Sequence, residues 1–242
     1  MKRVITAAAA AALAGVWVPT VAADDLISAD MVPGKFSANV ALTSEYFFRG
    51  ISQTDDSPAI QGGFDWAHEG TGLYLGVWGS NIDFNTGNSI EIDIYGGIGG
   101  TIDKFSWKAG GIWYAYPDDP GPLSQDYGEF TASVGYDFGL FNTGFSFFYS
   151  PDFFGESGHA EYYAFNIGIP IKMFTLNLVA GRQNIEKNDV FLLPDYWHYG
   201  ASISTGVAGF TLTLGVTDTD ISDTDCPDLC GATVTFTVSR SF

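Results

Sequence analysis

The last ten residues, Thr233 to Phe242, alternate between apolar side chains and small hydroxyl side chains. Successive side chains of a β-strand point to opposite faces, so a strand here has one apolar face and one polar face without acidic groups. In a soluble sheet the polar face would meet water and carry charges. The pattern is therefore typical of the closing strand of an outer-membrane β-barrel, apolar toward lipid and polar toward the lumen. Arg240 interrupts the apolar face near its end, where a long side chain can reach the lipid headgroups.

The N-terminal segment has the three regions of a secretory signal peptide. Met1-Lys2-Arg3 is basic, residues 4–18 are apolar, and Val21-Ala22-Ala23 is a cleavage site of small residues. The alternative is a retained membrane helix, but the apolar run is short, rich in alanine and followed by Pro19. We therefore expect residues 1–23 to be a cleaved signal peptide and residues 24–242 to be the exported chain.

Composition favours a transmembrane barrel over a soluble domain. Aromatic residues make up 16% of the chain, and charged residues also make up 16%, below the ~25% usual for soluble domains. After the signal peptide no apolar stretch reaches the ~18 residues of a membrane helix. A soluble β-sandwich or a lipocalin-like barrel is the alternative, and its exposed face should carry charges. We predict an all-β fold, a single up-and-down antiparallel barrel in the outer membrane of a Gram-negative bacterium.

Twelve segments alternate clearly or weakly between apolar and polar residues, and each is close to the ~9–11 residues of a tilted membrane strand. They are residues 36–49, 59–67, 73–82, 90–99, 105–116, 129–138, 142–149, 161–169, 174–181, 196–204, 210–217 and 232–242. Tight connections alternate with longer ones rich in Asp, Pro and Gly, as expected of short periplasmic turns and long external loops. We predict twelve strands, closed by pairing the first with the last. Ten or fourteen are the alternatives, because residues 59–67 and 142–149 are weakly patterned.

Aromatic residues gather near both ends of the predicted strands, as in the girdles of membrane barrels. Those assigned to the periplasmic end are Trp66, Trp107, Phe138, Phe141, Phe174, Phe210 and Phe242. Those assigned to the external end are Phe48, Trp113, Phe130, Tyr149, Tyr163 and Trp197.

One stretch of the sequence resembles a known family. The run from Ala38 to Trp66, which includes Glu45-Tyr-Phe-Phe-Arg49, is similar to the N-terminal signature of the TorF family of porins. The C-terminal Ser239-Arg-Ser-Phe242 is similar to that family's terminus as well. The resemblance is most specific over residues 37–83, and it implies an outer-membrane barrel of proteobacterial type. It implies little about the substrate and no functional residues.

The charge balance excludes one class of partner. The chain has 28 acidic and 10 basic residues, a formal net charge of −18, which becomes −20 without Lys2 and Arg3. A nucleic acid is therefore excluded as a partner. Much of the acid lies in the predicted external loops, where it forms either a solvated surface or a negative mouth that concentrates cations.

Further charged residues fall on the face predicted to line the lumen. The candidate lumen and selectivity residues are Glu45, Arg49, Asp65, Glu91, Asp93, Lys108, Glu129 and Asp137. Rings of carboxylates favour cations in a narrow pore, although the same residues can simply pair inside a polar interior. In that case Arg49 is expected to pair with Glu45 or with an acid on a neighbouring strand. Large aromatic residues at lumen positions predict a constricted barrel.

We therefore predict a narrow, porin-like channel for passive diffusion of small hydrophilic solutes, with a preference for cations. Two alternatives remain: a plugged structural or adhesive barrel acting through its acidic loops, and a membrane enzyme. For an enzyme, His198 is the base to consider, but its same-face neighbour is Gly200, and Ser202 is four residues away. We expect no enzymatic activity and no cofactor. The expected partners are outer-membrane lipid, lipopolysaccharide, small solutes or ions, and the barrel-assembly machinery, which would read Phe236, Val238 and Phe242.

The predicted loop 218–231 contains a possible metal motif and the only two cysteines. Counted from Asp218, a calcium loop of the EF-hand type needs Gly where Asp223 stands and Glu where Leu229 stands, so the motif fails. We predict no metal site there; loose cation binding between loops or to lipopolysaccharide is the alternative. Cys226 and Cys230 lie so close in an oxidising compartment that a disulfide is expected.

Overall fold

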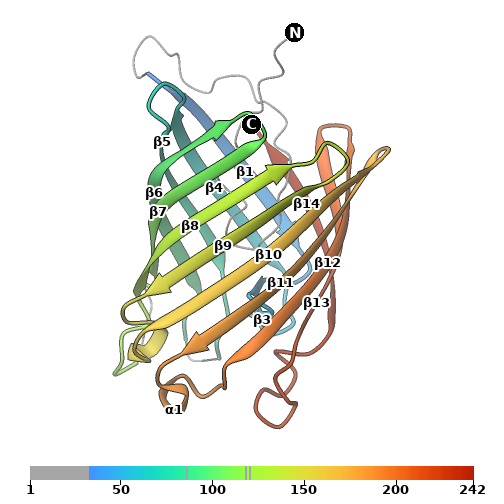
Figure 1. Cartoon of the computed structure of the whole chain (residues 1–242). Helices are drawn as coiled ribbons and strands as arrows, with labels where there is room; N and C mark the ends of the chain where they lie inside the picture. The colour runs from blue at the N-terminus through green and yellow to red at the C-terminus, as the bar shows by residue number, and fades with distance from the viewer. Residues whose placement is uncertain (1–32, 86, 118, 120) are drawn as a thin grey trace.

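The fold is a closed barrel of antiparallel strands in the computed structural model, which describes residues 33–85, 87–117, 119 and 121–242 (Figure 1). The predicted signal peptide and its cleavage site lie outside these residues. The barrel strands are β1 (Lys35–Thr43), β4 (Ala59–His68), β5 (Leu73–Asn81), β6 (Ile90–Ile102), β7 (Phe105–Ala115), β8 (Tyr127–Asp137), β9 (Asn142–Ser150), β10 (Ala160–Ile171), β11 (Phe174–Ile185), β12 (Tyr196–Val207), β13 (Phe210–Thr219) and β14 (Thr233–Ser241). The prediction of twelve strands is confirmed.

The first and last strands close the barrel, as predicted. β1 pairs with β14 from Asn39 opposite Ser241 to Thr43 opposite Thr237. The backbone N–H of Phe242 also donates to the carbonyl of Ala38 at 2.8 Å. Apart from this pair, each barrel strand is hydrogen-bonded to the barrel strand that precedes or follows it in the sequence, so the chain is a simple meander. Closure leaves no open sheet edge, which is the condition for strands to span a lipid bilayer.

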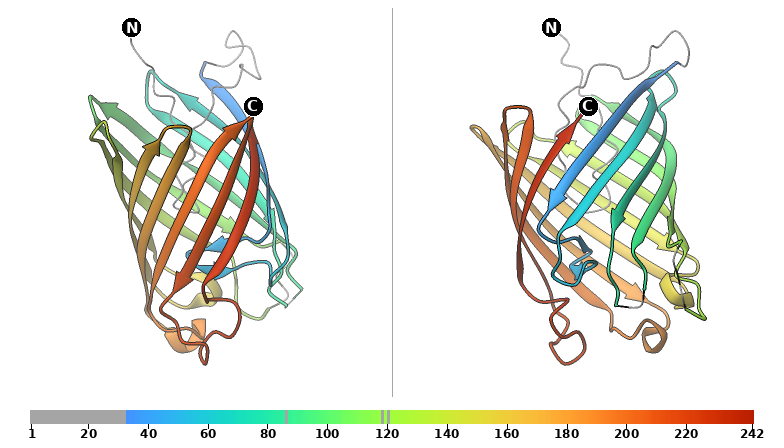
Figure 2. Two further views of the ribbon diagram at one scale, coloured as in Figure 1. Left: turned by 90° about the vertical axis from the view of Figure 1, so that its right-hand side faces the viewer. Right: turned by 180° about the vertical axis from the view of Figure 1, so that it is seen from behind.

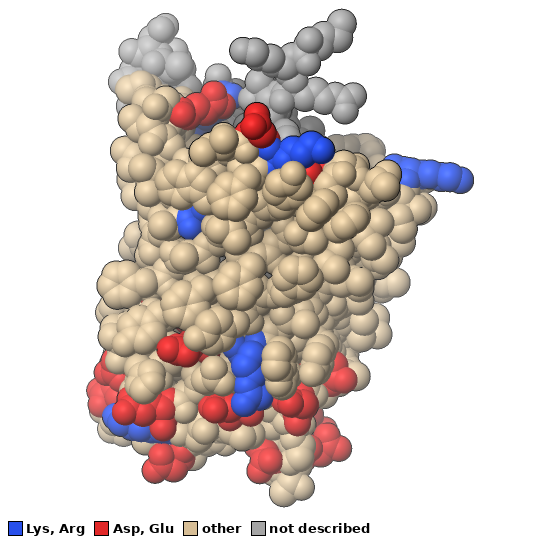
Figure 3. Space-filling view, viewed as in Figure 1, with Lys and Arg blue, Asp and Glu red and all other residues tan. Residues whose placement is uncertain are grey.

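The outer wall of the barrel is apolar. On β14 the alternation is as predicted: Val234 is 67% exposed and Phe236 49% exposed, whereas Thr235 and Thr237 line the interior. Figure 3 shows a broad uncharged band with acidic side chains gathered at the lower rim. Arg240 stands between two aromatic rings of this wall, with its guanidinium carbon 5.3 Å from the ring centre of Phe210 and 5.0 Å from that of Phe242. Such a wall suits hydrocarbon rather than water.

The two ends of the barrel differ in their connections. Residues 69–72, 103–104, 138–141, 172–173 and 208–209 form tight turns at the end where the C-terminus lies (Figures 1 and 2). The opposite end carries longer loops, which include the 3₁₀ turn η2 (Phe154–Glu156) and the short helix α1 (Asn188–Phe191). Within the described residues, no helix has the length and apolar character needed to cross a membrane.

The predicted first strand, residues 36–49, is wrong at its C-terminal end. β1 stops at Thr43, and residues 44–58, which we call the lumen insert, leave the wall and fold into the barrel (Figure 2). Phe48 therefore does not belong to an outer aromatic girdle; its ring packs inside against Tyr114, with centroids 5.7 Å apart. The apolar side chains of this segment are buried among interior aromatics instead of facing lipid.

Candidate functional site in the barrel lumen

The lumen insert is a small hairpin. Strands β2 (Phe47–Phe48) and β3 (Ile51–Ser52) pair with each other and not with the wall. Arg49 and Gly50 form the two-residue turn between them, with φ values of 51° and 86°. Two successive positive φ values are typical of a type I′ turn, which matches the twist of a hairpin. A side chain at position 50 would also clash with a neighbour, because a Cβ there would lie 2.6 Å from Cγ2 of Thr219.

Hydrogen bonds attach the insert to itself and to the external loops. The N–H of Gln53 donates to the carbonyl of Tyr46 at 2.8 Å and closes the hairpin base. The N–H of Ser52 donates to the carbonyl of Leu229 at 2.8 Å, and the carbonyl of Gln53 accepts from the N–H of Asp83 at 2.8 Å. The hairpin is therefore held from two loops that lie far apart in the sequence.

Arg49 fixes the tip of the insert to the far wall. Its Nη2 lies 2.6 Å from Oε2 of Glu129 on β8, and its Nη1 donates to Oε1 of Gln183 on β11 at 2.8 Å. The two charged side chains are only 4% and 1% exposed. Burial alone would lower the pKa of Arg49, but the carboxylate of Glu129 raises it above its usual value, so the guanidinium stays charged.

Aromatic rings surround the guanidinium of Arg49. Its carbon lies 4.3 Å from the ring centre of Tyr162, 4.6 Å from that of Phe48 and 4.9 Å from that of Phe148. Cation–π contacts of this kind are stronger when desolvated. Arg49 was predicted to pair with Glu45 or an acid on a neighbouring strand; that prediction is wrong, because Glu129 lies across the lumen.

Aromatic side chains pack together on one side of the lumen, beside the insert. The buried apolar residues of this cluster are Tyr46, Ala59, Trp78, Ile82, Ile112, Tyr114, Tyr116, Tyr127, Phe153, Ala160 and Ile185. The rings of Tyr114 and Tyr127 stack with centroids 4.4 Å apart, and the ring of Tyr46 meets that of Trp78 edge-on at 5.5 Å. These buried side chains form a packed core on this side of the lumen.

Two of the predicted lumen acids lie beside this aromatic cluster. Glu91 and Asp93 on β6 are 1% and 0% exposed. Oε1 of Glu91 accepts from the hydroxyl of Tyr46 at 3.4 Å, while its Oε2 and both carboxyl oxygens of Asp93 have no hydrogen-bond partner among the described residues. Nearer the end that carries the tight turns, Asp65 accepts from the hydroxyl of Tyr95 at 2.6 Å. All three of these acids are buried.

The remaining predicted site residues lie apart from one another. Glu45, in the insert, accepts from the hydroxyl of Ser52 at 2.5 Å, and burial raises its pKa although that hydrogen bond opposes the shift. Lys108 lies over the ring of Tyr74 at 5.5 Å from its centre. Asp137 is exposed at the rim that carries the tight turns, where it accepts from the N–H of Gly139 at 2.7 Å. The structure thus joins Arg49 to Glu129 and does not assemble the eight residues into one ring; their role in selectivity stays a prediction.

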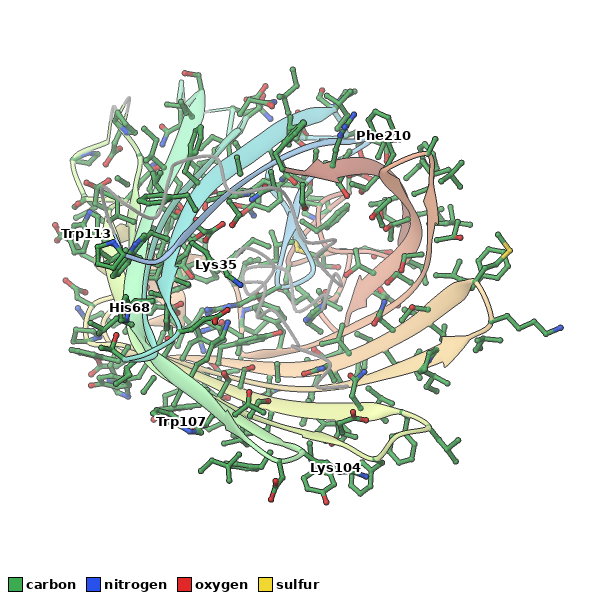
Figure 4. All side chains as sticks on the ribbon, turned by 90° about the horizontal axis from the view of Figure 1, so that it is seen from above. Lys35, His68, Lys104, Trp107, Trp113 and Phe210 are labelled. Atoms are coloured by element: carbon green, nitrogen blue, oxygen red, sulfur yellow. A yellow bond between two sulfur atoms is a disulfide. The ribbon has the colours of Figure 1, made fainter. Side chains whose placement is uncertain are left out.

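An open cavity of about 180 Å³ lies on the other side of the insert. It is bordered by the insert and by the lumen faces of β1, β4 and β11–β14. Its polar lining comes from Thr43, Glu45, Arg49, Gln61, Asn177, His198, Ser202, Thr213, Thr217, Thr235 and Thr237. Trp113 and Phe210, labelled in Figure 4, lie on the outside of the ring of strands that encloses this space.

Sequence reasoning did not single out Gln61, Asn177 and Ser202 as site residues. All three stand at inward positions of strands that were predicted correctly, so the period of two could have identified them. His198 also borders the cavity, and its Nδ1 lies 2.9 Å from the hydroxyl of Tyr162. It therefore lies in the lumen rather than on the outer wall, where an outer-membrane lipid hydrolase would need its base.

The loop 220–232 is stabilised locally. Cys226 and Cys230 form a disulfide with their Cα atoms 5.8 Å apart. Oδ1 of Asp220 accepts from the N–H of Trp197 at 2.6 Å, and Oδ2 of Asp225 accepts from the hydroxyl of Ser222 at 2.7 Å. In the described part of the chain, no three His, Cys, Asp or Glu residues form a group that could hold a metal ion.

Comparisons with known proteins give a family and a fold. Residues 28–242 match the family model described as "Bacterial protein of unknown function (Gcw_chp)". No curated protein matches this sequence. A NanC porin structure is similar with a TM-score of 0.54 at 7% identity, over 84% of this chain and 97% of that chain. A structure described as "Unveiling the Mechanism Behind the in-meso Crystallization of Membrane Proteins" has a TM-score of 0.52 at 6% identity, over 86% and 83%. These likenesses show a porin-type barrel fold, and the TorF resemblance stays a prediction.

Proposed function

The chain belongs to the bacterial Gcw_chp family, and we propose that it is a porin-like channel through which small hydrophilic solutes diffuse passively across the outer membrane. The resemblance to the TorF porins agrees with this function. We further propose that its outer wall contacts lipid, that its external rim contacts lipopolysaccharide, and that the barrel-assembly machinery reads its closing strand.

The observation that carries this function is the cavity beside the lumen insert. The insert and the aromatic cluster occupy one side of the barrel, while the side along β1 and β11–β14 holds about 180 Å³ of space lined by hydroxyl and amide groups. A polar lining inside an apolar wall favours hydrophilic cargo, and the partial filling limits its size.

A preference for cations is the finer part of the proposal. Glu45 borders the cavity, whereas Arg49 beside it is neutralised by Glu129. The external loops add many acids, including five aspartates between residues 218 and 228. A negative mouth and an acidic group beside the path raise the local concentration of cations.

Under a salt gradient across a lipid bilayer, we expect the purified barrel to show a reversal potential whose sign indicates selectivity for cations. We also expect proteoliposomes that contain it to swell in small neutral solutes and not in large ones. The substitution Glu45→Gln should move the reversal potential toward zero while the swelling rates remain. An anion-selective potential in the unaltered barrel would contradict the proposed role of its acids.

One observation favours a second function, a plugged barrel that acts through its external loops. The lumen insert is held by a buried ion pair and by hydrogen bonds to two loops, as a permanent plug would be. Such a barrel would admit no solute in the swelling experiment, so the same measurement separates the two functions.

A further inference from the structure

Polar side chains cross the wall of the cavity in a row. The strand register places Asn177 on β11 opposite Ser202 on β12, Ser202 opposite Gly215 on β13, and Gly215 opposite Thr235 on β14. All four residues border the cavity. Because they alternate with outward residues at the same register on four consecutive strands, they lie side by side in one row that runs across these tilted strands.

A second row of hydroxyl side chains lies beside the first, displaced from it by two residues on β12, β13 and β14. Ser204, Thr213 and Thr237 are opposite one another on β12, β13 and β14, and Thr237 is opposite Thr43 on β1. The hydroxyl of Thr237 donates to that of Thr43 at 2.9 Å. Of these residues, Thr43, Thr213 and Thr237 border the cavity, and neither row contains a charged side chain.

Two groups of the first row lack a protein partner. Nδ2 of Asn177 and Oγ of Ser202 are buried and have no hydrogen bond among the described residues. Asn177 as a whole is only 8% exposed. A buried polar group without a partner costs free energy, so such a pair at a cavity wall calls for a ligand or ordered water.

Gly215 keeps the row accessible. A Cβ at this position would lie 3.0 Å from Oγ1 of Thr235 and 3.6 Å from Cβ of Ser202. Any larger side chain would therefore fill the space between the two hydroxyls. With glycine there, Asn177 and Ser202 on one side and Thr235 on the other can reach the same small molecule.

We propose that Asn177, Ser202 and Thr235 form a binding site for a neutral, polyhydroxylated solute of the size of a monosaccharide. Amide and hydroxyl groups both donate and accept, as sugar hydroxyls do, whereas the row offers no charge to attract an ion. The volume of about 180 Å³ is below the ~300–1,000 Å³ of pockets for drug-sized ligands, which suits a single sugar ring. This assignment rests on the channel function proposed above and names its solute class.

The test is the effect of glucose on the ionic current through the full-length barrel in planar bilayers. We expect glucose to reduce the current in a saturable way, and sodium gluconate, an acid of similar size, to do so much less. Asn177→Leu and Ser202→Ala should each weaken the glucose effect about fivefold, as expected for the loss of one hydrogen bond. The matched control is Asn166→Leu on β10, an amide opposite Val179 that does not border the cavity, and it should leave the glucose effect unchanged.

The outcomes separate this site from the channel itself. If glucose leaves the current of the unaltered barrel unchanged, or if Asn177→Leu and Ser202→Ala respond to glucose as the unaltered barrel does, the site is refuted and the channel stands. If the unaltered barrel carries no ionic current, the channel function fails and the site fails with it. A variant that gives normal single-channel steps has folded, so a lost glucose effect in it supports the site.

Discussion

Replacing Arg49 with methionine should release the lumen insert and raise the conductance of the barrel. The substitution would leave the carboxylate of Glu129, only 1% exposed, without its counter-ion. Breaking a buried pair in this way costs about 3–5 kcal/mol. The wall strands keep their own ladders, so the strain should be relieved by movement of residues 44–58 out of the lumen and entry of water. Single-channel recording should show larger current steps than those of the unaltered barrel.

Limited proteolysis gives an independent measure of the same release. The insert contains Tyr46, Phe47 and Phe48, so chymotrypsin should cut the Arg49→Met barrel in this segment and spare the unaltered one. The matched control is the double variant Arg49→Met/Glu129→Gln, in which neither charge remains buried alone. Chymotrypsin should cut the insert of this variant less than that of Arg49→Met. If the Arg49→Met barrel kept the conductance of the unaltered barrel and also its resistance to chymotrypsin, the ion pair would not be what holds the insert.

The second large effect is expected on the outer face of the closing strand. Phe236 is 49% exposed on the apolar wall, and Phe236→Arg would place a charge against hydrocarbon. Such substitutions cost about 2–4 kcal/mol near the bilayer midplane and less toward the interfaces. The free energy of unfolding, measured by urea titration in lipid vesicles, should therefore fall by an amount within or somewhat below that range.

Thr235→Arg is the matched control, one residue away on the opposite face. Thr235 borders the polar cavity, where an arginine can be hydrated, so the loss of stability should be much smaller. If Thr235→Arg destabilised the barrel more than Phe236→Arg, the assignment of the two faces of β14 would be reversed.

The strands of the wall could be predicted because the two faces of each strand meet different surroundings. Lipid on one side and a polar lumen on the other impose a strict alternation, and β14 shows it from Val234 to Phe236. The alternation of tight turns and long loops then gives the order of the strands and the pairing of β1 with β14. These are local patterns, so they can be read without knowledge of distant contacts.

The lumen insert could not be predicted from the same pattern. Residues 44–49 continue the alternation of β1, with Tyr46 and Phe48 in phase with its apolar face, and so resemble more strand. The apolar side chains are in fact buried by the aromatic interior, which supplies the same apolar surroundings as lipid. The Arg49-Gly50 pair was the local signal for a turn, because only glycine suits its second position there.

The site was harder to predict than the wall because its contacts are non-local. Arg49 and Glu129 are 80 residues apart, and spacing along the chain does not indicate which acid across a lumen meets a given base. Glu91 and Asp93 are buried side chains of β6, but the face of a strand alone does not distinguish an open path from a packed side. The lumen insert packs with the aromatic cluster on one side of the lumen, and the cavity lies on the other side of the insert.

Single-channel conductance of the unaltered barrel in a planar bilayer is the most direct test of the central claim, that a narrow polar path remains beside the lumen insert. We expect small, steady current steps, because an open cavity lies along β11–β14 while a packed aromatic cluster occupies the opposite side. The Arg49→Met barrel recorded in parallel provides the larger steps of a released insert and proves that insertion into the bilayer has occurred. No current from the unaltered barrel, beside clear steps from Arg49→Met, would contradict the claim and identify the insert as a complete plug.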